Sequence, residues 1–106
     1  MSSWAYLILA GIFEIGFAST LKLTENFTKV IPTAIFFVFA SLSFYFLTKA
    51  AQTLPIGTAY AVWTGIGAAG TIAVGIFFYN EPAGILRLFF LFTLVASIVG
   101  LKLVAN

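Results

Sequence analysis

The stretch that decides the fold is residues 30–48, VIPTAIFFVFASLSFYFLT, which contains 19 consecutive residues without a charged side chain. A helix needs about 20 predominantly apolar residues to cross the hydrocarbon core of a bilayer. Charged residues mark both ends of the run, with Lys29 just before it and Lys49 just after it. The stretch therefore predicts one membrane-spanning helix.

Three further apolar runs are separated from it by short polar links. Together the four runs predict spanning helices at residues 4–21, 30–48, 55–79 and 85–104. Each of the three prolines falls at a helix entrance, where the missing N–H costs little. We expect an all-α membrane protein in which residues 1–106 form a single domain of four transmembrane helices.

The composition supports this class and excludes several others. Hydrophobic residues make up 62% of the chain, beside five Lys or Arg residues and three Asp or Glu residues. A soluble domain is about half apolar and about a quarter charged, so it could not hide this much apolar surface. The chain has no Cys and no His, so we expect no cofactor and no metal site, and no basic cluster indicates nucleic acid.

The charges in the links give little guidance on orientation. Lys22, Lys29 and Arg87 would lie on one side of the membrane, and Lys49 and Lys102 on the other. Positive residues in short loops normally set the orientation. A bias this small favours insertion both ways up, with two inverted copies forming an antiparallel homodimer. One orientation winning by a weak preference is the alternative.

Glu14 is an acid about ten residues into the first span, near the predicted bilayer midplane. An ionised carboxylate there costs about 3 kcal/mol, so we expect it to take up a proton or a cation. Gly11, Phe17 and Ala18 share its helix face. The two small residues would let another helix or a ligand come close, and Phe17 would provide an aromatic wall. A protonated Glu14 that only hydrogen-bonds between helices is the alternative.

The third span carries a second candidate binding group. Tyr60 and Trp63 are three residues apart and face one way, and each combines a cation-attracting ring with a polar tip. We expect them to bind substrate, although an interfacial aromatic belt is the alternative. Ser43 in the second span is a candidate donor to a carboxylate, unless it bonds its own backbone. Gly65 and Gly67 permit a kink and predict a hinge in the third helix.

The fourth span carries no candidate chemistry. Ala96, Ser97 and Gly100 give it the small-residue spacing that lets membrane helices pack closely. We expect this stripe to pack in a dimer, and small residues facing lipid without a partner are the alternative.

Three motifs together resemble the small multidrug resistance family of bacterial proton-coupled exporters. They are GIFE at residues 11–14, LPIGTAYAVWTGIG at residues 54–67 and GLK at residues 100–102. The resemblance covers the whole chain and is nearest to the guanidinium-exporter branch. It implies an antiparallel homodimer in the bacterial plasma (inner) membrane, where two copies of Glu14 bind protons or a cationic substrate in exchange.

The same resemblance implies that Ser43, Tyr60 and Trp63 surround Glu14. One position differs from the pattern of the guanidinium branch, which normally has Trp where this chain has Phe17. Phe cannot donate an indole hydrogen bond to the carboxylate, so we expect a site more tolerant of substrate shape.

The predicted function is a proton-coupled antiporter that exports small organic cations. Guanidinium and substituted guanidiniums are the expected substrates, with quaternary ammonium ions as a further class. A subunit of a heteromeric exporter and a cation-selective channel are the alternatives. An enzyme is disfavoured, because one carboxylate in an apolar span has no acid–base partner, metal ligand or nucleophile beside it.

Overall fold

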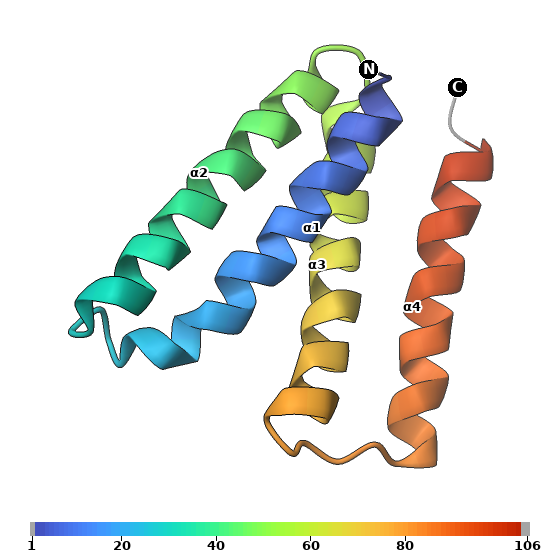
Figure 1. The fold of residues 1–106 in the computed structure, drawn as a ribbon. Coiled ribbons are helices and arrows are strands. Elements are labelled where there is room, and N and C mark those ends of the chain that lie inside the picture. Colours follow the sequence, from blue (N-terminus) through green and yellow to red (C-terminus); the bar gives the residue numbers. More distant parts are fainter. Residues whose placement is uncertain (1, 105–106) are drawn as a thin grey trace.

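The computed structural model describes residues 2–104 and is built from four long helices. They are α1 (Ser3–Leu21), α2 (Val30–Ala51), α3 (Ile56–Phe78) and α4 (Ile85–Val104), and a short 3-10 turn, η1 (Lys22–Thr24), follows α1 (Figure 1). All four are long and apolar enough to cross a membrane. The predicted all-helical class is therefore confirmed, and the four helices are consistent with the four predicted spans. The second helix extends to Ala51, three residues past the expected end, because the chain stays helical through Lys49.

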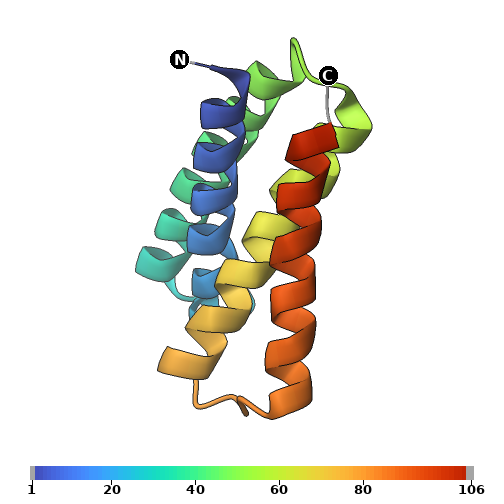
Figure 2. The same ribbon diagram turned by 90° about the vertical axis from the view of Figure 1, so that its right-hand side faces the viewer.

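The helices pack in a chain of neighbours rather than around a closed core. Helix α1 packs against α2 and α3, whereas the backbone of α4 packs against α3 alone within residues 2–104 (Figures 1 and 2). The start of α1, the α2–α3 link and the end of α4 lie at one end of the bundle, and the other two links lie at the opposite end. The result is a slab of 43 × 35 × 19 Å.

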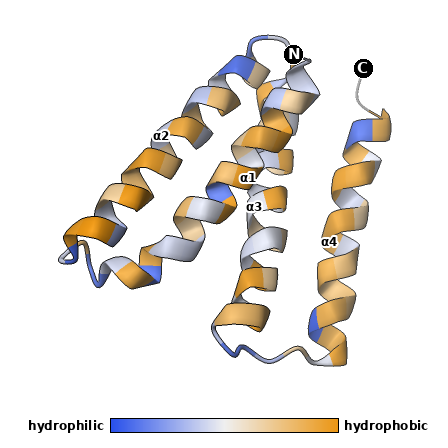
Figure 3. Ribbon diagram, viewed as in Figure 1, coloured by the Kyte–Doolittle hydropathy of each residue, from blue (hydrophilic) through white to orange (hydrophobic). Residues whose placement is uncertain are grey.

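Most of the surface of this slab is apolar. Figure 3 shows hydrophobic residues along the length of all four helices and hydrophilic residues mainly near their ends. No described residue of α4 is buried. The small core consists of six residues: Leu7, Ala10, Ala50, Ala59, Val62 and Trp63. Helices that are apolar all round need an apolar solvent, and here the hydrocarbon of a bilayer supplies it.

Glycines set the closest helix contacts. A Cβ built on Gly11 of α1 would lie 2.5 Å from Cγ2 of Ile66, so only a glycine admits that side chain of α3. On the other side of α3, a Cβ on Gly65 would lie 2.9 Å from Cδ1 of Ile98 in α4. Small residues that let helix backbones approach are the usual means of association in membranes, where lipid is as apolar as the helices.

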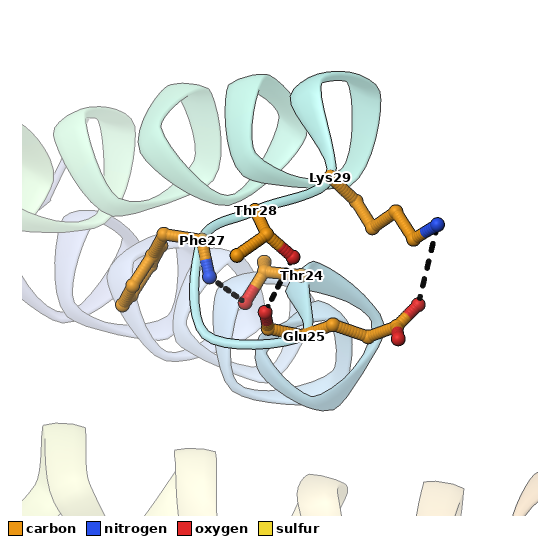
Figure 4. Close-up of polar contacts among 5 residues, drawn as sticks. All are labelled: Thr24, Glu25, Phe27, Thr28 and Lys29. Atoms are coloured by element: carbon orange, nitrogen blue, oxygen red, sulfur yellow. Dashed lines mark hydrogen bonds and ion pairs between the residues drawn. The ribbon is translucent and has the colours of Figure 1, made fainter.

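The link between α1 and α2 is a tight, hydrogen-bonded turn (Figure 4). Residues 25–27 all have left-handed backbone angles, with φ of 47°, 64° and 65°. The backbone N–H of Phe27 donates to the Thr24 hydroxyl at 3.3 Å, and Glu25 pairs with Lys29 at 3.9 Å. Left-handed backbone costs about 1–2 kcal/mol per residue, and these contacts offset part of that cost in the hairpin of the first two helices.

Candidate functional site

Glu14 projects from α1 onto the backbone of α3. A Cβ at Gly67 would collide with Oε1 of Glu14 and would lie 2.8 Å from its Cγ, so the absent side chain of this glycine makes room for the carboxyl group. The Oε1 atom is buried and accepts no hydrogen bond from residues 2–104. Buried polar atoms almost always have a partner. A carboxyl oxygen left open in this way is suited to a proton or to a cationic guest.

Ser43 lies at the crossing of three helices. Its hydroxyl donates to the carbonyl of Ala10 in α1 at 2.6 Å and accepts from the indole Nε1–H of Trp63 in α3 at 2.9 Å. A hydroxyl has one hydrogen, and the Ala10 carbonyl takes it. Within this subunit Ser43 therefore orients Trp63 and does not donate to Glu14, and no bond joins Tyr60 to the carboxylate either. The predicted hydrogen bonds to the carboxylates are absent from the single chain.

Four aromatic side chains from three helices form a continuous row beside Ser43. The ring centroids of Phe17 and Phe44 are 6.3 Å apart, those of Phe44 and Trp63 are 5.3 Å apart, and those of Trp63 and Tyr60 are 5.8 Å apart. The structure thus brings together the three predicted aromatic residues. It adds Phe44, which sequence reasoning missed, because nothing distinguishes it from the many phenylalanines of its span.

The row runs from the half-buried Phe17 to Tyr60, which is 58% exposed. Aromatic faces attract cations, and the faces of large rings also bury apolar area. The exposed rings of Phe44 and Tyr60 are therefore the ones that an organic cation could meet, whereas Trp63 is 7% exposed and packs in the core.

The remaining predicted residues of α1 and α3 take up packing positions. Gly11 packs against Ile66, and Gly67 packs against Glu14. Gly65 faces α4, and Ala18 is half-buried on α1. Helix α3 is continuous through both of its predicted hinge glycines. A bend at that point stays a prediction.

The small residues of α4 lie on an open face. Ala96 and Ser97 are exposed, and a Cβ built on Gly100 would meet no atom within 4 Å. Helix α4 uses a different face, which includes Ile98, to contact α3. The small-residue stripe is therefore free to receive another helix.

Comparison with known protein families identifies the family of this chain. The family model described as Small Multidrug Resistance protein matches residues 2–94. The chain belongs to the small multidrug resistance family. Membership confirms the resemblance drawn from the motifs in the first and third spans. Within residues 2–104 of this family member, no group of three His, Cys, Asp or Glu residues could hold a metal ion.

Curated relatives in the small multidrug resistance family are similar over nearly the whole chain. A probable guanidinium efflux system subunit, GdnC, of Bacillus licheniformis is 46% identical over 103 residues, which cover 97% of this chain and 92% of the relative. A guanidinium exporter of Citrobacter freundii is also 46% identical, over 95% of this chain and 96% of the relative. A guanidinium exporter of Salmonella typhimurium is 44% identical, over 98% and 99%. These names describe transporters rather than enzymes.

Proposed function

We propose that this chain is a proton-coupled antiporter that exports guanidinium and substituted guanidiniums, with quaternary ammonium ions as a second substrate class. The observation that carries the proposal is the buried, unpartnered Oε1 of Glu14 beside Gly67. The names of relatives that are 46% identical support the choice of guanidinium. Their bacterial origin supports a place in the inner membrane.

Exchange follows from competition for one negative charge. A protonated Glu14 is neutral and can stay in the bilayer, whereas an ionised Glu14 needs a cation to compensate it. A cation therefore binds only after the proton has left, and the returning proton displaces it. Such competition lets each ligand drive the other, because each binds one charge state of the same group. Trp63, held by Ser43, and the neighbouring rings would wall the cation.

The transport unit in this proposal is an antiparallel homodimer. A slab 19 Å thick is about two helix diameters deep, so it cannot enclose a substrate path by itself. The open stripe of Ala96, Ser97 and Gly100 offers a surface for the second copy. In such a dimer, Ser43 and Tyr60 could hydrogen-bond a Glu14 carboxylate in one of two ways. They would either give up their present contacts within their own subunit or bond Glu14 of the other copy.

The homodimer has its own test. Tags on the C-terminus of the wild-type chain should react on both faces of the cell membrane, because positive charge is nearly balanced between the two sides. Two added lysines in residues 52–54 should shift the population to one orientation and reduce transport. A wild-type C-terminus found on one face only would rule out the inverted pair.

The central experiment replaces Glu14. Glu14→Gln keeps the size of the side chain but cannot ionise, so the purified variant in liposomes should show no proton-coupled guanidinium transport. Glu25→Gln is the matched control, because Glu25 is an exposed acid in the α1–α2 link, and it should transport like the wild type. Continued uphill pumping by Glu14→Gln would refute the proposal. Flux that neither saturates nor exchanges protons would instead indicate a cation channel.

A second candidate, a subunit of a heteromeric exporter, is favoured by one relative's name, which calls it an efflux system subunit. Reconstitution of the chain alone decides between the two. Guanidinium transport by the single purified species would exclude an obligatory second subunit. Transport only after another chain has been added would replace the homodimer with a heteromer.

A further inference from the structure

A pocket that Glu14 does not line lies between α1, α3 and α4. It has a volume of about 270 Å³, near the lower end of small-molecule pockets, which start at roughly 300 Å³. Apolar side chains line it, among them Ile8, Ile66, Ile98 and Val99, and the remaining contributors include Trp4 and Lys102. Its walls come from the end of the bundle where α1 starts and α4 ends (Figures 1 and 2).

Lys102 places one positive charge at this pocket. Its ammonium group lies 5.5 Å from the ring centroid of Trp4, and no carboxylate within residues 2–104 pairs with it. The residue is exposed in the last turn of α4, where a lysine extends its charge to the membrane surface. Tryptophan is also enriched at that level. The pocket therefore combines an apolar slot at membrane depth with a cation at the interface.

This combination excludes the transported cation as the natural occupant. A guanidinium ion would meet a positive charge and no carboxylate, since neither Glu14 nor any other acid of residues 2–104 lines this pocket. A second copy packed on the small-residue stripe is the competing occupant. Leu103, which lines the slot, follows Gly100 by three residues and Ala96 by seven, so it shares their helix face.

We propose that the pocket binds an anionic phospholipid from the surrounding bilayer, with an acyl chain in the slot and the headgroup phosphate on Lys102. The slot opens to the region that lipid tails already occupy, because Ile8 and Val99 are 46% and 51% exposed. Anionic headgroups are attracted to lysines at the membrane surface. Bound there, the lipid would lie between α1 and α4, which meet at this end of the bundle through Trp4 and Lys102. The site is independent of the transport proposed for Glu14.

The test uses the delipidated full chain in detergent, titrated with phosphatidylglycerol or phosphatidylcholine. Retained lipids are counted by native mass spectrometry, and the melting temperature is followed in parallel. The wild type should retain phosphatidylglycerol with about a fivefold preference, which is what one interfacial lysine contributes. Lys102→Gln should lose the preference, and Val99→Phe, which fills the slot, should lose retention of both lipids.

Lys49→Gln is the matched control. Lys49 is also an exposed lysine at the end of a spanning helix, with its ammonium 5.5 Å from the Tyr45 ring, but it does not line the pocket. This variant should keep the wild-type preference. The proposal is overturned if the wild type shows no preference, if Lys102→Gln keeps it, or if Lys49→Gln loses it equally. It is also overturned if Val99→Phe retains lipid, or if it dissociates the protein into monomers without any lipid having been bound, because a second copy would then be the occupant.

Discussion

The packing of the Glu14 carboxyl group against α3 can be tested by giving Gly67 a side chain. In Gly67→Ala the new methyl group would lie 2.8 Å from Cγ of Glu14 and would overlap its carboxyl group, whereas ordinary contacts begin near 3.4 Å. The acid must leave its rotamer, at a cost of about 0.5–1.5 kcal/mol, or α1 and α3 must part, at a cost of about 1–3 kcal/mol. Replacing glycine inside a helix returns about 1 kcal/mol.

These terms nearly cancel for stability but not for function. We expect the free energy of unfolding of Gly67→Ala to change by less than about 0.5 kcal/mol if the acid changes rotamer, and to fall by up to about 2 kcal/mol if the helices part. The carboxylate, however, is displaced from its seat. Guanidinium affinity in liposome-based recordings should therefore fall about tenfold, which corresponds to about 1.4 kcal/mol.

Two other glycines provide the controls for this experiment. Gly57→Ala adds a methyl group with no atom within 4 Å, so its transport should match the wild type. Gly65→Ala meets Cδ1 of Ile98 at 2.9 Å, the movable end of a side chain, and should have a small effect. Wild-type affinity in Gly67→Ala would refute the seat on α3. An equal loss in Gly65→Ala would show that the two glycines act together as a hinge.

Two further substitutions examine the neighbouring side chains. Ser43→Ala leaves the buried indole N–H of Trp63 without an acceptor and should destabilise the protein by about 1–3 kcal/mol in thermal unfolding. Ser41→Ala removes an exposed hydroxyl that is bonded to its own helix, so it should be neutral. Equal melting temperatures of the two variants would contradict the hydrogen bond between Ser43 and Trp63. Phe17→Trp should narrow the substrate range toward small guanidiniums. The measurement is the current carried by guanidinium, a phenyl-substituted guanidinium and a tetra-alkylammonium. If the order of these currents is the same as in the wild type, the Phe17 ring only packs against Phe36 and Phe44.

Sequence patterns predicted the helices well because the bilayer imposes a simple rule. A spanning segment must be long, apolar and internally hydrogen-bonded, so four apolar runs and their polar links were enough to place α1 to α4. The same rule singled out Glu14, since an acid at that depth is costly wherever its neighbours lie. The identity of the third-span motif added the family, which the comparison confirmed.

The contacts between helices required the tertiary structure. These helices are apolar on nearly every side, so no polar stripe distinguishes the face that meets a neighbour from the face that meets lipid. Pattern alone therefore could not show that Ser43 donates to Ala10, or that Phe44 joins the aromatic row. It also could not show that Gly67 receives Glu14.

The chain by itself thus determined the number of long apolar helices, their approximate ends, and which acid lies in the middle of one of them. Only the packed structure decided which residues meet across helices, and it placed the backbone of α4 against α3 alone within residues 2–104. The physical reason is that transfer into hydrocarbon depends on each segment's own composition, whereas helix association in lipid depends on close fit between particular side chains. That fit rests on single glycines such as Gly11 and Gly67, whose partners are far away in the sequence.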